Sequence, residues 1–119
     1  RNLIASSITL ANAGNQSSVI TRSTDYLRIP SRAEVGHDVN AVPYKNEVST
    51  DASEVTFSLF TDNNSRIKKT FNGDGSAQYW WLRSAYAGAA TQFCGVNGFG
   101  GAINDIASNS YGVCVGFSV

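Results

Sequence analysis

The hexapeptide Tyr79-Trp80-Trp81-Leu82-Arg83-Ser84 is the stretch that decides the fold of this chain. It contains both tryptophans of the protein, and bulky aromatic residues of this kind favour a strand. Because successive strand residues face opposite sides of a sheet, Trp80 and Trp81 cannot enter the same core layer. We therefore expect one tryptophan to fill the core and the other to pack under the loops. Arg83 is expected to be an internal strut, paired with a carboxylate or with loop carbonyls.

Downstream of this strand, a segment without a clear period is enclosed by a second block of strand-forming residues. The segment runs from Tyr86 to Ile106, and the closing block runs from Tyr111 to Val119. A rigid frame around an irregular interior is a common arrangement for binding loops. The sequence therefore predicts that residues 86–106 form a ligand-binding face held by the two flanking blocks.

The rest of the chain predicts short strands, many turns and little helix. Ser31 and Glu34 match a capping box, which predicts a short helix from Arg32 that Gly36 breaks. Turns or loops are expected at residues 11–18, 37–53, 61–65 and 72–76. Further strands are expected near Leu3–Leu10, Val19–Arg22, Asp25–Pro30, Val55–Leu59, Thr91–Val96, Ala102–Asn104 and Gly112–Val119. At Val55–Leu59, Phe60 would also suit one helical turn. The predicted fold class is α+β, with short helices, long irregular loops and a small antiparallel C-terminal sheet.

Composition restricts the classes of function. The chain has 119 residues, 42% of them hydrophobic, and a formal net charge of zero. One domain is expected at this length. Nucleic-acid binding is disfavoured, because phosphate attraction needs a basic excess. The one basic cluster, Arg66, Lys68 and Lys69, is interpreted as a solvated turn.

Membrane insertion is not expected, because no apolar run approaches the roughly 18 residues of a spanning helix. No signal peptide is visible either. The sequence begins at Arg1 and contains no methionine. We therefore expect it to be a processed piece, the C-terminal domain of a longer protein.

Enzyme and metal chemistry find little support in the sequence. His37, the only histidine, is expected to be exposed in a polar loop, far in sequence from Cys94 and Cys114. The two cysteines are best interpreted as buried free thiols, with a disulfide between two strands as the open alternative. Asn72–Ser76 resembles a calcium loop only superficially, since Arg83 stands where an EF-hand needs Glu. We expect no catalysis, cofactor or metal.

Several motifs in order resemble a known family. They are Leu27–Val35, Arg66–Lys68, Trp80–Ser84, Phe93–Val96 and Asn109–Val113, the last followed by Gly116-Phe117. The series resembles the C-terminal domain of the DUF6273-type group, found in gut-bacterial and phage proteins with a C-type-lectin-like fold. The resemblance implies a domain over residues 22–119, with residues 1–21 as a strand and loop segment packed on it.

The stretch from Ser84 to Val119 is also similar to the variable region of proteins diversified by a retroelement. That mechanism mutates adenines, so Asn codons become other residues, and Asn97, Asn104 and Asn109 are scattered here among such residues. Gln92 departs from this pattern. The implied ligand-binding residues are Tyr86, Ala90, Gln92, Gly95, Asn97, Phe99, Ile103, Asn104, Asp105 and Ile106, and the implied scaffold residues are Trp80, Trp81, Arg83, Tyr111 and Phe117.

The resemblance implies a non-catalytic receptor-binding or adhesin domain. Its partner would be a protein or glycan receptor, and it would be displayed on a virion, at a tail or head fibre, or on a bacterial cell surface. A homotrimer is the form the analogy suggests. For Phe99 and Ile103 a place in the core stays open as an alternative.

Two other functions stay open. The first is a structural virion or surface-decoration domain, in which the same sheet packs against sister subunits. The second, more remote, is a copper oxidase of the formylglycine-generating type, in which Cys94 and Cys114 would meet across adjacent strands. Calcium-dependent sugar binding is disfavoured, because the Glu-Pro-Asn or Gln-Pro-Asp and Trp-Asn-Asp triplets of those lectins are missing.

Overall fold

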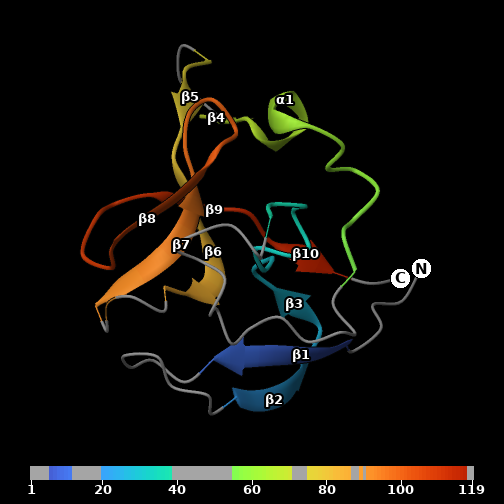
Figure 1. Cartoon of the computed structure of the whole chain (residues 1–119). Helices are drawn as coiled ribbons and strands as arrows, with labels where there is room; N and C mark the ends of the chain where they lie inside the picture. Colours follow the sequence, from blue (N-terminus) through green and yellow to red (C-terminus); the bar gives the residue numbers. More distant parts are fainter. Residues whose placement is uncertain are drawn as a thin grey trace.

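The computed structural model describes residues 6–11, 20–38, 55–70, 75–86, 89 and 91–117. In this part of the chain, short strands form three two-stranded sheets and one four-stranded sheet, with one turn of α-helix (Figure 1). The elements are β1 (Ser6–Ala11), β2 (Ile20–Asp25), β3 (Leu27–Arg28), α1 (Asn63–Arg66), β4 (Lys68–Lys69), β5 (Ala77–Gln78), β6 (Trp80–Ala85), β7 (Gln92–Val96), β8 (Ala102–Ile106), β9 (Gly112–Val113) and β10 (Gly116–Phe117). The domain is therefore mixed and sheet-rich, with little helix.

The N-terminal strands form a hairpin. β1 and β2 pair antiparallel, from Ser6 opposite Asp25 to Ala11 opposite Ile20. The two strands predicted near 3–10 and 19–22 are thus confirmed with shifted bounds. The strand predicted at 25–30 is wrong in its extent, because the chain bends at Tyr26 and only β3 follows. The expected loop at 11–18 lies almost wholly outside the described residues.

The four-stranded sheet has the order β8-β7-β6-β9. β6, β7 and β8 are antiparallel neighbours, but β9 pairs parallel to β6, with Trp80 opposite Gly112. The prediction of an antiparallel C-terminal sheet is therefore wrong at this edge. The single closing strand predicted at 112–119 is also wrong, because only β9 pairs with β6, whereas β10 pairs with β3. Figure 1 shows this crossing from the sheet to the centre of the molecule.

The core lies on one face of this sheet. Trp80 and Leu82 from β6 meet Cys94 and Val96 from β7, and the loop residues Val35 and Phe60 cover them. The Phe60 ring lies 6.2 Å from the Trp80 ring, and the Trp80 indole N–H donates to the Arg66 carbonyl at 2.9 Å. Trp80 is thus the tryptophan that fills the core. The expectation that the two tryptophans face different sides is confirmed, since Trp81 alternates with the buried Trp80 and Leu82.

The predicted capping box is present, but the predicted helix is not. The Ser31 N–H donates to the Glu34 carboxylate, and the Glu34 N–H donates to the Ser31 hydroxyl. The segment that follows is a single hydrogen-bonded turn. Gly36 ends it at φ 76°, with His37 N–H bonded to the Arg32 carbonyl in the pattern of a Schellman cap. Between Pro30 and Gly36 there is room for only one turn.

This turn is fastened to β6. The Arg32 N–H donates to the buried Ser84 hydroxyl at 2.9 Å, and the Arg83 N–H donates to the Pro30 carbonyl at 3.0 Å. The Arg83 guanidinium donates to both carboxylate oxygens of Glu34, at 2.7 and 3.0 Å, and also to the Ile29 carbonyl. Arg83 is therefore bonded to both kinds of acceptor expected for an internal strut.

The segment 55–60 departs from its prediction. Val55 and Leu59 are exposed, and the segment forms a loop in which the Phe57 N–H donates to the Glu34 carbonyl. The strand predicted there is wrong, because Phe57 and Phe60 pack inward at the spacing of a turn.

The segment predicted as a turn at 61–65 contains α1, which begins with a capping box between Asp62 and Ser65. Arg66 at the end of α1 is buried, and its guanidinium donates to the Val35 and Gly36 carbonyls and to Asn63. The interpretation of Arg66 as part of a solvated turn is therefore wrong.

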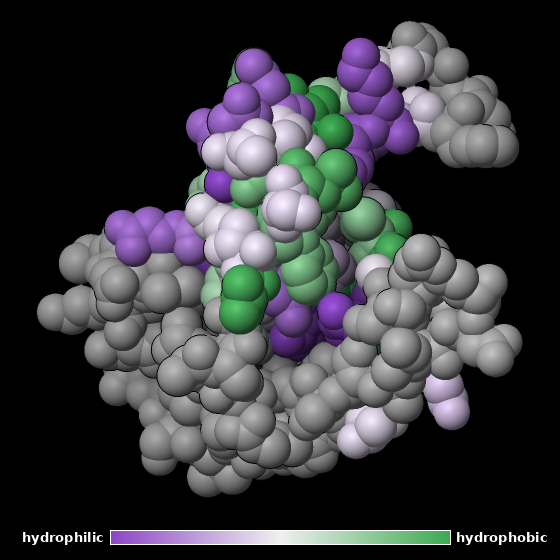
Figure 2. Space-filling model, turned by 90° about the vertical axis from the view of Figure 1, so that its right-hand side faces the viewer, coloured by the Kyte–Doolittle hydropathy of each residue, from purple (hydrophilic) through white to green (hydrophobic). Residues whose placement is uncertain are grey.

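Hydrophobic side chains also reach the surface. Figure 2 shows one side of the molecule, where hydrophobic residues gather along the middle and hydrophilic residues lie above them. The large exposed hydrophobic residues of the described part are Tyr26, Leu27, Val55, Leu59, Tyr79, Phe99, Ile106, Val113 and Val115. Grouped apolar surface of this kind often marks a contact site.

Candidate ligand-binding face

The strand register divides the predicted site residues between two faces of the sheet. Ile103 pairs with Gly95 and Asp105 pairs with Phe93, so these side chains share the outer face with Trp81. Asn104 and Ile106 pair with Cys94 and Gln92, so they lie on the core side. β8 is the edge strand, which leaves its residues half-buried or exposed. The predicted face is thus one strand edge together with its connecting turns.

The turn between β7 and β8 presents Phe99 to solvent. Phe99 is 82% exposed, the highest value among the large hydrophobic residues of the described part. The Asn97 side-chain oxygen accepts from the backbone N–H groups of both Phe99 and Gly101, each at 2.9 Å. The Asn97 N–H also donates to the Gly101 carbonyl at 2.9 Å. Phe99 is therefore not core, and Asn97 serves to hold the turn.

The same turn is anchored to α1 and to the loop at His37. Gly100 has φ +82°, and a Cβ there would lie 1.8 Å from the Asn63 carbonyl oxygen, so only glycine fits. The His37 Nε2–H donates to the Gly100 carbonyl at 3.0 Å, because a carbonyl can only accept. Phe99 therefore projects from backbone that is fixed on both sides.

His37 itself is a correction to the sequence prediction. It is 8% exposed rather than an exposed loop histidine. Its pKa is lowered from 6.5, mainly by burial and further by the positive charges of Arg66 and Arg32, while the bond to Gly100 acts in the opposite direction. The Nδ1 atom is buried without a partner among the described residues. The neutral form of His37 therefore holds the turn in place.

On the outer face, three aromatic rings form a row. Tyr111 lies between Tyr79 and Trp81, with ring centroids 5.2 and 4.7 Å away. The Tyr111 hydroxyl donates to Asp105 at 2.6 Å. This bond lowers the pKa of Asp105 and raises that of Tyr111, because it stabilises the charged carboxylate and the neutral phenol. We call Tyr79, Tyr111 and Trp81 the aromatic row.

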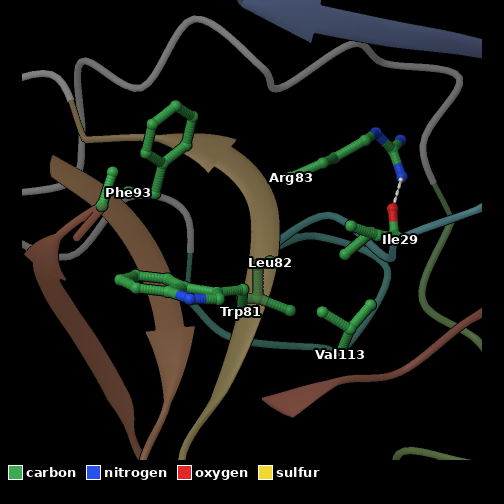
Figure 3. Close-up of a pocket in the computed structure, with 7 residues that line it drawn as sticks. Ile29, Trp81, Leu82, Arg83, Phe93 and Val113 are labelled. Atoms are coloured by element: carbon green, nitrogen blue, oxygen red, sulfur yellow. Dashed lines mark hydrogen bonds between the residues drawn. The ribbon is translucent and has the colours of Figure 1, made fainter. Parts of the chain in front are cut away.

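Next to the row, an open groove of about 340 Å³ runs along the same face. In Figure 3 the Trp81 ring and Phe93 lie on the left, Val113 and Ile29 lie on the right, and Arg83 donates to the Ile29 carbonyl at the upper right. The lining residues are Ile29, Trp81, Leu82, Arg83, Phe93, Ala107 and Val113. The groove is apolar, and of these lining residues only Phe93 belongs to residues 86–106.

At the far end of β8, polar and apolar groups lie side by side. The Asn104 amide donates to the Gln92 side-chain oxygen at 2.6 Å. Ile106, opposite Gln92 in the ladder, is 43% exposed. These three predicted residues are thus brought together on one surface, separate from the aromatic row.

Other predicted site residues serve the backbone or the core. Gly95 is buried, and a Cβ there would lie 2.9 Å from the Trp80 carbonyl oxygen and 3.4 Å from the Ile103 side chain. Tyr86 is half-buried and packs against the core. Ala90 lies outside the described residues. Gly95 is therefore required for the close approach of β6, which argues against a direct contact with ligand.

The scaffold residues differ in what the structure shows of them. Trp80 packs in the core and Arg83 pairs with Glu34. Trp81 and Tyr111, by contrast, lie on the outer face. For Phe117 only the backbone pairing with Leu27 is described. Sequence reasoning missed Tyr79 and Asn109 as site residues. The alternation along the strand could have placed Tyr79 beside Trp81, but no sequence signal connects Asn109 with the Tyr111 hydroxyl, to which its amide donates.

The two cysteines do not lie on adjacent strands. Cys94 is buried in β7, and Cys114 follows β9, on the other side of β6 in the strand order. Both are free thiols. Among the described residues, no group of three His, Cys, Asp or Glu could hold a metal ion. No helix in this part of the chain is long and apolar enough to cross a membrane.

Comparison with known proteins gives one finding. A family model described as a domain of unknown function, DUF6273, matches residues 4–119. No curated protein matches the chain, and no solved structure matches it.

Proposed function

The chain belongs to the DUF6273 family, and from the way its β7–β8 turn presents Phe99 we propose that it is a non-catalytic ligand-binding domain. In this proposal the domain is a receptor-binding or adhesin module with a C-type-lectin-like fold, displayed on a phage particle or a bacterial surface. It binds a protein or glycan receptor through residues of the 86–106 segment, which a retroelement diversifies. Trimerisation is part of the same proposal.

The observation that carries the proposal is the contrast between Phe99 and the backbone beneath it. The side chain is exposed, yet the turn is held by Asn97, by the Gly100–Asn63 contact and by His37. An aromatic side chain on fixed backbone supplies contact area at little cost in conformational entropy. In the part of the chain that the structure describes, no core contact requires a phenyl ring at this position, so a role in binding accounts for it.

The absence of catalysis in the proposal is supported by how the reactive side chains are used. A nucleophile needs a base within hydrogen-bond reach. In the described part of the chain, the His37 side chain bonds only to the Gly100 carbonyl. The adjacent-strand arrangement that a copper site at Cys94 and Cys114 would need is not present, because β6 lies between β7 and β9.

Deep sequencing of clonal populations that carry the gene tests the proposal. We expect substitutions at Phe99 and at the β8 residues Ile103, Asn104 and Ile106. Gly95 and Asn97 provide an internal control within the same segment, since they hold the backbone and should stay constant. Trp80–Ser84 should stay constant as well. An adenine-rich near-repeat of codons 84–119 beside a reverse transcriptase gene is the expected genomic companion.

The outcomes separate the proposal from its main alternative. Constancy throughout 86–106, without a template repeat, would overturn diversification and favour a structural decoration domain. Variation at Gly95 and Asn97 equal to that at Phe99 would overturn the assignment of roles within the segment, because both residues would then tolerate changes that the turn geometry forbids.

A further inference from the structure

The aromatic row is a continuous apolar surface rather than a set of separate rings. Tyr111 contacts both neighbours, at centroid distances of 5.2 Å to Tyr79 and 4.7 Å to Trp81. These separations are those of packed aromatic pairs, so no ligand fits between the rings. A ligand could only lie across them. Tyr79 is 43% exposed, and Trp81 and Tyr111 are half-buried, so the row is accessible from solvent.

The row has no evident role in the core. Trp81 lies on the face of β6 opposite to Trp80 and Leu82, which fill the core. The turn residue Gly98 lies close to Tyr79, where an added Cβ would come within 3.9 Å of the Tyr79 ring. The row therefore extends from the base of the Phe99 turn toward the apolar groove at Trp81.

Polar groups border the row at Tyr111. Asp105 accepts from the Tyr111 hydroxyl with one carboxylate oxygen and from the Ile106 N–H with the other, at 2.6 and 2.8 Å. Each oxygen has a second lone pair. The Asn109 amide nitrogen donates to the Tyr111 hydroxyl at 3.3 Å, and its amide oxygen has no partner among the described residues. The ring of Tyr111 is thus fixed in place, with hydrogen-bond acceptors beside it.

The rings of the row are tilted, by 48° between Tyr79 and Tyr111 and by 39° between Trp81 and Tyr111. An apolar surface of this kind, edged by acceptors, offers a single ring face to one class of ligand. A hexopyranose has a face of C–H groups that packs on an aromatic ring and hydroxyls at its edge that donate to carboxylate or amide oxygens. A quaternary ammonium needs ring faces arranged around a central space, and the packed rings leave none. The negative charge of Asp105 disfavours uronic and sialic acids.

We propose that Tyr79, Tyr111 and Trp81 form a binding site for a neutral hexopyranose, with Asp105 and Asn109 accepting from its hydroxyls. The inference rests on the proposed function and names the ligand class of that face. It needs no calcium, since the acceptors are already beside the rings. A single sugar ring buried on one side should bind with a dissociation constant of about 1 mM, as expected from the low binding energy per atom of small ligands.

The test is a titration of the full 119-residue chain, monitored by tryptophan fluorescence and by amide chemical shifts. The probes are the methyl glycosides of glucose, galactose, mannose and N-acetylglucosamine, with methyl glucuronide and choline as charged comparisons. We expect saturable binding of at least one neutral glycoside. Tyr79→Ala should weaken it about 3- to 10-fold, the value of one aromatic contact, and Asp105→Asn should weaken it too. Leu59→Ala, an exposed hydrophobic truncation outside the row, should leave it unchanged.

Each other result overturns the inference. Absence of saturable binding by all four neutral glycosides removes the sugar site, and choline binding alone would show a cation site instead. Tighter binding of the glucuronide would contradict the role of Asp105. Sugar binding that Tyr79→Ala does not change would place the site elsewhere. Failure of the proposed function is distinguishable, because it is read from sequence variation and from cell binding through Phe99, neither of which uses these probes.

Discussion

Two regions of the molecule are held by polar contacts. One is the junction between residues 30–34 and β6, and the other is the turn at residues 97–101. They differ in whether a side chain is left without contacts inside the molecule. At the junction, Arg83, Glu34 and Ser84 are all bonded to other parts of the chain, and the ion pair is almost completely buried. In the turn, hydrogen bonds of the same kind fix the backbone, while the Phe99 ring is exposed to solvent. Rigidity is therefore common to frame and face, and what distinguishes the face is a side chain without an internal partner.

The largest expected effect breaks the junction. Glu34→Gln keeps a residue that can close the capping box but removes the charge that Arg83 contacts at 2.7 Å. Loss of one partner of a buried ion pair leaves the other charge uncompensated, at a cost of about 3–5 kcal/mol. We expect the free energy of unfolding, measured by urea denaturation, to fall by this amount.

Asp62→Asn is the matched control for that change. Asp62 caps α1 from an exposed position, and asparagine caps a helix as well as aspartate does. We expect a change within about 0.5 kcal/mol. If Glu34→Gln also cost less than about 1 kcal/mol, the pair would behave like an exposed surface ion pair, and the junction would not be the stable half of the comparison.

The second-largest effect is expected from a substitution that displaces the turn at residues 97–101. Gly100→Ala places a Cβ where the Asn63 carbonyl lies 1.8 Å away, at φ +82°, so the turn must leave α1. Gly75→Ala is the control, because Gly75 has φ +78° and no atom within 4 Å of an added Cβ. The control should cost about 1–2 kcal/mol for the left-handed backbone alone. Thermal unfolding should show a clearly larger loss for Gly100→Ala, and equal losses would mean that the contact with Asn63 is not what anchors the turn.

The sequence could predict those elements that have a local pattern of residue types. Alternating bulky residues placed β6 and β7 within a residue or two, and the Ser31–Glu34 pair predicted its capping box. It could not predict that β9 pairs parallel to β6, since partners that distant along the chain leave no local signal. The strand expected at 55–59 failed because Phe57 and Phe60, three residues apart, both turn inward, while the alternating Val55 and Leu59 are exposed.

The candidate site was predictable as a segment but not as a surface. Phe99 and Ile106 were identified and are exposed, whereas Gly95 and Asn97 in the same segment serve the backbone. A list of residues cannot separate these roles, because they depend on which strand lies opposite. His37 shows the same limit. Its polar neighbours in sequence predict exposure, and only the tertiary contact with Gly100 explains its burial.

Acid acts on the same turn through His37 and is expected to have a smaller effect than Gly100→Ala. The pKa of His37 is lowered in the folded chain, chiefly by burial, so the unfolded chain binds a proton first as pH falls. The stability that this histidine contributes is complete above its ordinary pKa of 6.5 and is lost as pH falls from there through the lowered value.

Melting temperatures measured from pH 7.5 to pH 5 should therefore fall more steeply for the parent chain than for His37→Gln, whose amide can still donate to Gly100 and does not titrate. Parallel curves for the two chains would show that His37 is accessible to protons in the folded state at no cost, and that the turn is less firmly held than its contacts indicate.

The smallest effect on stability should accompany the largest effect on binding. Phe99→Ala removes a ring that is 82% exposed, so the free energy of unfolding should change by no more than about 0.5 kcal/mol. Binding of the labelled chain to bacterial cells that bind the parent should weaken by about 30-fold or more, the range of an interface hot spot. Leu59→Ala, 66% exposed on the loop before α1, should change neither quantity.

A loss of stability above about 1 kcal/mol for Phe99→Ala would make Phe99 part of the packing, like the residues of the junction. Cell binding that both variants retain would place the receptor-binding surface away from the turn.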